Sequence, residues 1–307
     1  MRIVFMGTPD FAVTSLRRLV EDGHEIVGVF TQPDKPGNRK KMTASPVKTY
    51  ALEQGLSVYQ PERMRGEEPL ALLRELNPEL TVVAAFGQIL PEDILNVPQC
   101  GSINVHASVL PKYRGAAPIN WAILNGESET GITIMHMAKK LDAGDIISVC
   151  KTPIAPDEDA VSLFARLAEL GAELLSDTIP AIAAGTASRT PQDDTASTYA
   201  SMLSREMSPI DWNKPAEQIV NQVRGLVPWP CASTMLDGKT AKVWHAELGS
   251  ETSDAVGTLR VTKRGIEAAC GDGMSVIISE LQFEGGKRMA AGAWFNGKRA
   301  APGTILV

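Results

Sequence analysis

Apolar and polar positions in the first third of the chain alternate between the periods of strands and helices. Apolar runs at 2–7 and 24–32 predict strands, and the longer run at 79–91 predicts a strand that is buried on both faces. Residues 9–23, between the first two runs, have the apolar spacing of an amphipathic helix, with Pro9 near its first turn. A strand, a helix and a strand in succession form a βαβ unit, which predicts parallel strands joined by a right-handed crossover.

The same alternation continues through residue 185 and predicts an α/β domain with a Rossmann-like, mostly parallel sheet. The turn after the first strand reads GTPDF and lacks the GxGxxG fingerprint, and the sequence contains no GxxxxGK[ST] loop. Binding of NAD or ATP is therefore not expected. Further helices are expected at 69–77, 91–97, 118–126 and 159–185, and further strands at 102–105, 130–140 and 145–154.

The pattern changes after Val227 to short alternating segments that are interrupted by Gly and Asp-Gly, which predicts a small β-barrel or sandwich. Residues 186–213 are rich in Thr, Ser, Asp and Pro and show no sustained period, as is typical of a linker. We therefore expect an N-terminal domain over 1–185, a linker over 186–209 and a C-terminal domain over 210–307.

Composition narrows the class of protein. The chain has 307 residues, of which 44% are hydrophobic and 21% are charged, as in a soluble globular protein with two domains or one large one. The sequence shows neither a membrane-spanning run nor the features of a signal or transit peptide, so we expect a cytoplasmic protein with no membrane partner. Four scattered cysteines without a CxxC pair indicate reduced thiols and argue against a zinc site.

Charge is unevenly distributed. The net charge of −6 discourages a general nucleic-acid surface, yet residues 31–48 carry five basic residues and one acidic residue, a local charge of +4. Its two early prolines indicate a loop, and the stretch is unusually long for a connection between a strand and a helix. It is either a solvated loop or a mobile basic finger that contacts phosphates.

Candidate chemistry lies where the 102–105 strand ends. Asn104 and His106 are two positions apart, so on a strand their side chains share a face, and a loop rich in Pro and Gly follows. Asp142 lies on a tight turn between two predicted strands. The alternative is structural: a hydrogen-bonded Asn, a surface His and an Asp that only forms its turn.

Together the three side chains would suit transfer of an acyl group to an amine. The amide N–H of Asn104 could stabilise a developing oxyanion, His106 could exchange a proton, and Asp142 could orient the imidazole or accept a proton from the amine. Because the set contains no side-chain nucleophile, direct transfer through a tetrahedral intermediate is favoured over a covalent acyl-enzyme. His106 and Asp142 are 36 positions apart, so the spacing leaves their convergence open.

Several segments resemble the folate-dependent formyltransferases. The stretch VHASVLPKYRGAAP resembles a motif specific to that superfamily, and the fuller resemblance is to the methionyl-tRNA formyltransferase family. The resemblance runs in order through both domains. The remaining segments that carry it are MRIVFMGTPDFA, TQPDKPG, SPVK, AAFGQILP, ITIMHMAKKLDAGDII, VRGLVPWPCAST and NGKRAAPGTIL.

The resemblance implies an enzyme that transfers the formyl group of 10-formyltetrahydrofolate to the α-amino group of methionyl initiator tRNA, for the initiation of translation. It implies that Asn104, His106 and Asp142 are the catalytic residues, with no metal, and that the C-terminal domain is an OB-like barrel that helps to hold tRNA. We expect a monomer. The residues implied to bind folate are Phe86, Gly87, Gln88, Ile89, Leu90, Ser108, Val109, Leu110 and Pro111, and those implied to contact tRNA are Lys35, Arg39, Lys40 and Lys41.

This sequence departs from the family pattern at two places of interest. The basic loop is one residue shorter than usual, and His136 stands where Gln or an aromatic residue is common. We interpret His136 as a strand residue and not as a second catalytic base. The rival hypotheses are a related enzyme that formylates an amino-sugar nucleotide or hydrolyses formyl-folate, and a non-catalytic folate- or RNA-binding protein on the same scaffold.

Overall fold

The computed structural model describes residues 1–36, 42–236, 238–298 and 305–306, and it divides into two compact units. The first unit comprises residues 1–115, 130–152 and 164–200, and the second comprises residues 116–129, 153–163 and 201–307. The second unit therefore takes in two short segments from the part of the chain that we expect to form the N-terminal domain. The domain boundaries at residues 185 and 210 stay a prediction.

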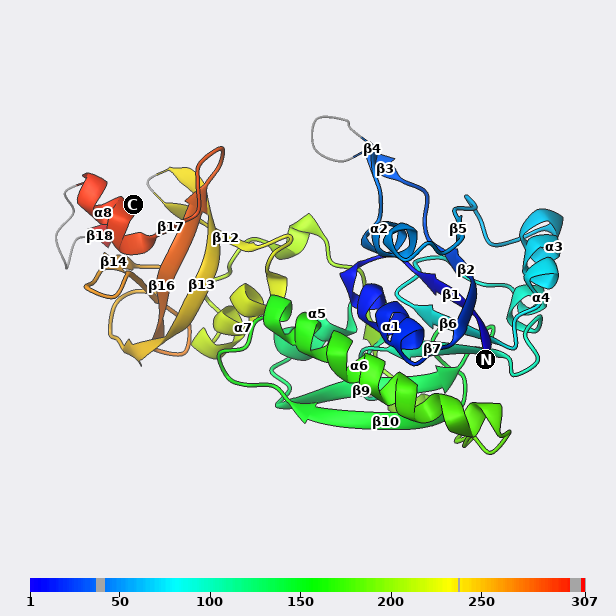
Figure 1. Cartoon of the computed structure of the whole chain (residues 1–307). Coiled ribbons are helices and arrows are strands. Elements are labelled where there is room, and N and C mark those ends of the chain that lie inside the picture. The colour runs from blue at the N-terminus through cyan, green and yellow to red at the C-terminus, as the bar shows by residue number, and fades with distance from the viewer. Residues whose placement is uncertain (37–41, 237, 299–304, 307) are drawn as a thin grey trace. The chain divides into compact units, whose positions relative to one another are not determined.

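The first unit is built on a seven-stranded sheet with the order β10-β9-β7-β6-β1-β2-β5 (Figure 1). Its strands are β1 (Arg2–Gly7), β2 (Glu25–Phe30), β5 (Val58–Tyr59), β6 (Leu80–Ala84), β7 (Ser102–His106), β9 (Glu129–His136) and β10 (Ile146–Pro153). β1 pairs in parallel with β2 and β6, β2 with β5, and β6 with β7, whereas β9 pairs antiparallel to β7. The prediction of a mostly parallel α/β sheet is confirmed.

Helices cover this sheet. They are α1 (Asp10–Glu21), α2 (Pro46–Glu53), α3 (Glu67–Leu76), α4 (Glu92–Leu95) and α6 (Ala160–Ala183). Helices α1 and α6 lie on the same face (Figure 1), where the rings of Phe11 and Phe164 meet edge to face with centroids 5.4 Å apart. On α1, Phe11, Leu16 and Leu19 are buried, as the apolar spacing predicts.

Strand and helix side chains of the first unit share an apolar core. Val4, Met6 and Phe30 from the strands pack in one cluster with Leu73 of α3 and Phe86, which follows β6. Each fully buried side chain of this size contributes about 2 kcal/mol of burial free energy. This core holds β1 and β6, and β6 in turn pairs with β7, whose end carries part of the candidate site.

The second unit contains an antiparallel sheet with the order β12-β13-β16-β15-β14-β18, and β17 pairs with β16. The elements are β12 (Ala232–Leu236), β13 (Lys239–Glu251), β14 (Leu259–Val261), β15 (Ile266–Ala269), β16 (Met274–Phe283), β17 (Met289–Ala290), β18 (Ile305–Leu306), α5 (Pro118–Leu124), α7 (Ala216–Leu226) and α8 (Ala291–Lys298). An antiparallel C-terminal β domain is thus confirmed, and its OB-like character stays a prediction. Helix α5 packs on α7, where Asn120 Nδ2 donates to Gly225 O at 2.8 Å.

Part of the segment expected to be a linker is ordered. It contains the 3₁₀ helices η2 (Asp194–Ala196) and η3 (Arg205–Met207) and strand β11 (Tyr199–Ala200). β11 pairs in parallel with β8 (Arg114–Gly115), just after β7 along the chain. In the part of the chain that the structure describes, no helix is both long and apolar enough to cross a bilayer.

Candidate active site

The end of β7 carries two of the expected catalytic residues. Asn104 pairs with Val83 of β6 and Met135 of β9, and His106 pairs with Thr133 of β9. Because the two residues are separated by one position on a regular strand, their side chains share a face. His106 is 5% exposed, and Asn104 is half-buried.

His106 is held through a main-chain carbonyl. Its Nε2 lies 2.9 Å from Tyr113 O. A carbonyl oxygen can only accept, so Nε2 carries the proton of the neutral imidazole. The second ring nitrogen, Nδ1, is then the position that can gain a proton.

The loop between β9 and β10 brings Asp142 to this histidine. Asp142 Oδ2 lies 3.7 Å from His106 Nδ1 and accepts a hydrogen bond from Gly115 N at 2.8 Å. Asp142 has φ +49°, in the left-handed region that Asp tolerates better than most residues. The structure therefore brings together the His and the Asp that the sequence could not link, and their catalytic roles stay a prediction.

The Asn104 amide has a different environment. Within residues 1–36, 42–236, 238–298 and 305–306, no hydrogen bond to its side chain is found. An amide N–H on the same strand face as His106 is consequently available to a bound oxygen.

The loop after β6 holds the first group of residues that the resemblance assigns to folate. Gln32 Nε2 donates to Gly87 O at 2.7 Å, and Thr8 Oγ1 donates to Phe86 O at 2.9 Å. Phe86 and Leu90 are buried, whereas Ile89 is 84% exposed. Ile89 is thus the member of this loop whose apolar side chain is most open to a ligand.

The Gln88 side chain binds the neighbouring segment, and its contact with folate stays a prediction. Its Oε1 accepts from Met64 N at 2.8 Å, and its Nε2 donates to Pro61 O at 3.2 Å.

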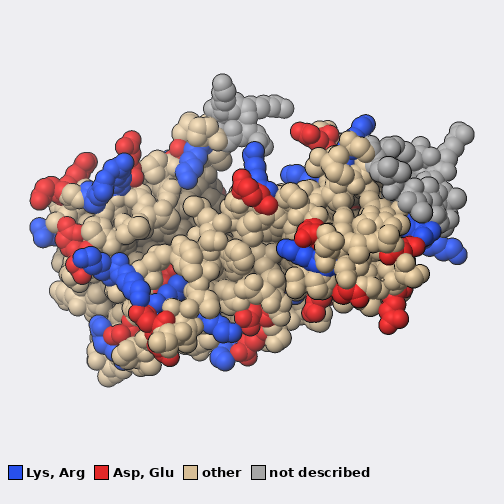
Figure 2. Space-filling model, turned by 180° about the vertical axis from the view of Figure 1, so that it is seen from behind, with Lys and Arg blue, Asp and Glu red and all other residues tan. Residues whose placement is uncertain are grey.

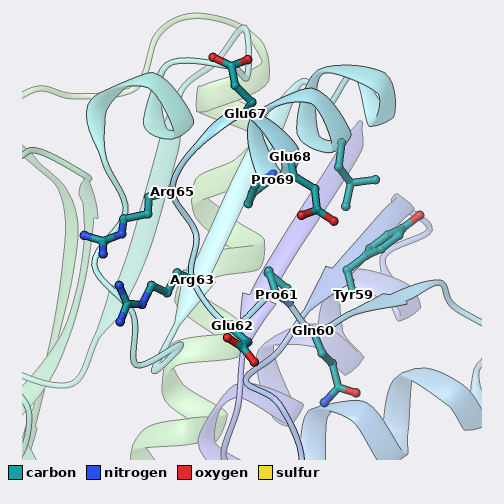
Figure 3. Close-up of a pocket in the computed structure, with 10 residues that line it drawn as sticks. Tyr59, Gln60, Pro61, Glu62, Arg63, Arg65, Glu67, Glu68 and Pro69 are labelled. Atoms are coloured by element: carbon teal, nitrogen blue, oxygen red, sulfur yellow. The ribbon is translucent and has the colours of Figure 1, made fainter.

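The segment that contains Pro61 forms one wall of a groove of about 640 Å³. In Figure 3, Arg63 and Arg65 extend to the same side of the segment. The groove is lined by Tyr59, Gln60, Pro61, Glu62, Arg63, Arg65, Glu67, Glu68, Pro69 and Leu72, and thus by none of the residues predicted from the sequence.

The second expected folate loop follows β7 and is closed by its own hydrogen bonds. Ser108 Oγ donates to Lys112 O at 2.6 Å, and Thr133 Oγ1 bridges Ser108 O and Leu110 N at 2.7 and 3.1 Å. Ser108 and Leu110 are buried. Val109 and Pro111 are half-buried and offer the accessible surface of this loop.

The basic loop is only partly within the described residues. Lys35 lies in the short strand β3 (Lys35–Pro36), which pairs with β4 (Met42–Thr43), and it is exposed. Lys48, in contrast, donates to Asp34 Oδ2 at 2.7 Å, a hydrogen bond that lowers the pKa of that carboxyl. The other residues expected to contact tRNA, Arg39, Lys40 and Lys41, lie outside the described residues. Figure 2 shows basic and acidic side chains interspersed over the face that it presents.

His136 is the last residue of β9 and is buried there. It lies on β9 opposite Ile103, is 9% exposed, and its Nε2 has no hydrogen-bond partner in the described part of the chain. Burial, and secondarily the nearby Arg189, lowers the pKa of this imidazole, while Asp145 acts in the opposite direction. The position of His136 on a strand is confirmed, and its lack of a catalytic role stays a prediction.

Sequence reasoning missed the main-chain groups that position the pair. Tyr113 O and Gly115 N bind His106 and Asp142, respectively, and both residues have positive φ, +61° and +119°. The Tyr-Arg-Gly order allows such a turn but does not identify it. Among the described residues there is also no group of three or more His, Cys, Asp and Glu side chains that could hold a metal ion.

Comparisons with known proteins agree with this architecture. Residues 1–179 match the family model described as formyl transferase, and residues 202–299 match that of the formyl transferase C-terminal domain. The chain is 48% identical over 307 residues to a methionyl-tRNA formyltransferase from Geobacter sulfurreducens, covering 100% of this chain and 96% of the relative. It is 50% identical over 311 residues to one from Halalkalibacterium halodurans, covering 100% and 98%.

Solved structures share the fold at lower identity. An N-formyltransferase from Helicobacter canadensis, in complex with folinic acid and dTDP-3-aminofucose, has a TM-score of 0.71 and 21% identity and covers 91% of this chain and 98% of its own. HypX from Aquifex aeolicus, in complex with tetrahydrofolic acid, has a TM-score of 0.62 and 16% identity and covers 100% of this chain and 50% of its own. Because its two family matches span both units and its relatives align from end to end, the chain belongs to the formyl transferase family, with the methionyl-tRNA formyltransferases as full-length relatives.

Proposed function

We propose that this protein transfers the formyl group of 10-formyltetrahydrofolate to the free α-amino group of methionyl initiator tRNA, as a monomer in the cytoplasm. The observation that carries the proposal is the approach of Asp142 to His106 at 3.7 Å, in a chain that aligns end to end with methionyl-tRNA formyltransferases. Identity near 50% over the full length favours this acceptor over an amino sugar, because the N-formyltransferase from Helicobacter canadensis that is bound to dTDP-3-aminofucose shares the fold at only 21% identity.

The chemistry is a direct acyl transfer. The uncharged amine attacks the formyl carbon, a C–N bond forms, and the carbonyl oxygen becomes an oxyanion. The Asn104 amide and protonated His106 stabilise that oxyanion. Collapse breaks the bond to N10 of the folate, and His106 donates a proton to the departing nitrogen while Asp142 accepts the amine proton through a water.

The geometry supports these roles for His106 and Asp142. Tyr113 O holds the Nε2 proton, so the second proton of the imidazolium lies on Nδ1, and this N–H is the one that donates to the substrate. The Asp142 carboxylate, 3.7 Å from Nδ1, is too far to accept that proton in a hydrogen bond and acts as its counter-ion. Gly115 N donates to that same carboxylate oxygen and keeps it in place beside the ring. Both side chains are about nine-tenths buried or more, so their interaction is less screened than one at the surface.

The folate side of the proposal rests on two loops. The loops after β6 and β7 follow adjacent parallel strands, so they meet at one edge of the sheet, where α/β proteins bind ligands. Ile89, Val109 and Pro111 offer apolar contact surface there. On the tRNA side, Lys35 and the basic loop supply phosphate contacts.

Incubation with methionyl-tRNA and labelled 10-formyltetrahydrofolate tests the proposal. We expect label on the aminoacyl group, and no label when N-acetyl-methionyl-tRNA replaces the substrate, because the acetyl group removes the attacking amine. A binding protein without catalysis would retain both ligands and transfer no label in a single turnover, which would contradict the proposal.

A further inference from the structure

The segment of residues 190–200, which follows α6, contacts the loop that carries Asp142. Thr190 exchanges two main-chain hydrogen bonds with Ile146, at 2.8 and 3.0 Å. Gln192 Nε2 donates to Asp142 O at 2.9 Å and to Gly144 O at 2.7 Å. One side-chain amide thus uses both of its N–H groups to hold the two carbonyls that flank the turn.

The turn at residues 142–144 has a constrained backbone. Asp142 has positive φ, and a Cβ placed on Gly144 would lie 1.8 Å from His136 O. The turn therefore packs directly against strand β9. Gln192 supplies the hydrogen-bond donors for the carbonyls of Asp142 and Gly144.

Arg114 holds Gln192 from the other side. Its Nε and Nη2 both donate to Gln192 Oε1, at 3.1 and 2.8 Å, and its Nη1 donates to Asp194 Oδ1 at 2.7 Å. Lys140 Nζ lies 2.5 Å from the other carboxylate oxygen of Asp194. Arg114 is 5% exposed, so this fork is buried and fixes the Gln192 amide in one orientation.

The same segment also fixes the residues that bind His106. Thr198 accepts from Tyr113 N through its Oγ1 at 2.8 Å and from Arg114 N through its carbonyl at 2.9 Å. A Cβ on Gly115 would lie 2.5 Å from Ala200 O, so β11 packs directly on β8. One segment therefore contacts both halves of the pair: the turn that carries Asp142, and the 113–115 backbone that binds His106 and Asp142.

We propose that Gln192 is a positioning residue for formyl transfer, and that it acts through Asp142 with Arg114 as its support. This inference rests on the proposed function, since it concerns the rate of that reaction. Without the Gln192 amide, the 142–144 turn loses two hydrogen bonds and Asp142 is no longer held at its distance from His106. Misplacement of a catalytic group by about 1 Å can cost about 100-fold in rate.

The test uses two substitutions with different effects on Arg114. Gln192→Glu keeps an oxygen for Arg114 but removes both donors to the turn, and Gln192→Leu removes both contacts. The matched control is Gln222→Leu, because Gln222 is also half-buried and its Nε2 also donates to loop carbonyls, those of Met207 and Pro209 at 2.8 and 3.1 Å. Urea unfolding of each variant shows whether it folds. If Gln192→Leu does not fold, Gln192→Glu alone provides the test.

We expect both Gln192 variants to lower kcat by between about 10- and 100-fold with the KM of each substrate within about twofold, and Gln222→Leu to leave kcat unchanged. In an Asp142→Ala background the Gln192 substitutions should lower kcat no further, because the residue through which they act is gone. A wild-type kcat in the Gln192 variants, or an equal fall with and without Asp142, would overturn the inference. Absence of transfer by the wild-type protein would instead overturn the proposed function.

Discussion

The Asp142 carboxylate lies 3.7 Å from His106 Nδ1, while the Tyr113 carbonyl lies 2.9 Å from His106 Nε2. The first distance is too long for a hydrogen bond but suits a counter-ion, and the second is an ordinary hydrogen bond. The main chain therefore sets the orientation of the imidazole, and Asp142 supplies the charge beside it.

Removing either member of the pair should abolish most of the activity. We expect His106→Ala and Asp142→Ala each to lower kcat by about 100-fold or more, because proton transfer and oxyanion stabilisation depend on them, while the affinity for tRNA stays within about twofold. Single-turnover formyl transfer and a tRNA titration measure the two quantities. Asp145→Asn, in the same loop but 37% exposed in its side chain, is the control and should retain wild-type kcat. Near-native turnover of either alanine variant would contradict the assigned mechanism.

The basic loop should govern tRNA binding alone. Replacing Arg39, Lys40 and Lys41 with Glu reverses three charges, so we expect the KM for tRNA to rise at least tenfold and its dependence on salt to become shallower. The KM for 10-formyltetrahydrofolate, measured in the same assay, is the internal control and should not change. An unchanged tRNA titration would rule out the loop as a phosphate contact.

The sequence predicted the features that depend on short-range patterns. The apolar run at 2–7 became β1, and only the first part of the run at 79–91 became β6, which ends at Ala84. The helical spacing after residue 9 became α1, and the period-two pair Asn104 and His106 lies on β7. Each of these follows from burial along one element, which the order of residues determines directly.

The site's supporting contacts could not be predicted in this way. Gln192 and Thr198 stand in a polar stretch without a period, and their partners lie 50 and 85 positions away, at Asp142 and Tyr113. The groups that they bind are mostly main-chain carbonyls and N–H groups, which every residue carries, so no residue type marks them. Gln88 is a further example, because no pattern in the sequence predicts its hydrogen bonds to Met64 N and Pro61 O, and its contact with folate stays a prediction.

Gly144 should tolerate no side chain. A Cβ there would lie 1.8 Å from His136 O, so Gly144→Ala must shift backbone and should lower the free energy of unfolding by about 2 kcal/mol or more. Urea unfolding monitored by circular dichroism measures the loss. Gly292→Ala is the control, because nothing lies within 4 Å of its Cβ and Ala favours the α8 helix by up to about 1 kcal/mol. Equal stability of the two variants would contradict the close approach.

Stability should fall in mild acid because of His136. Burial lowers the pKa of this imidazole below its ordinary value of 6.5, so the unfolded chain takes up the proton first as the pH falls. The contribution of the buried, neutral His136 to the free energy of unfolding is fully present above pH 6.5. It is lost as the pH falls through 6.5 towards the pKa of His136 in the folded state. His24, whose pKa burial also lowers, contributes with the same sign.

Urea unfolding at about pH 7 and about pH 5 tests this linkage. The free energy of unfolding of the wild-type protein should be lower at the acidic pH, and His136→Phe should show a smaller decrease because one of the two imidazoles is gone. An identical pH dependence in the variant would show that His136 titrates normally and that its burial does not affect its proton affinity.

The choice of acceptor separates methionyl-tRNA formylation from the rival activity on an amino-sugar nucleotide. The measurement is kcat/KM for formyl transfer from 10-formyltetrahydrofolate to methionyl-tRNA and, in parallel, to a dTDP-amino sugar, the class of acceptor bound by the structural relative from Helicobacter canadensis. We predict a value for methionyl-tRNA at least about 1,000-fold greater, because the local charge of +4 over residues 31–48 favours an acceptor that carries many phosphates. Equal values, or a greater value for the sugar nucleotide, would contradict it.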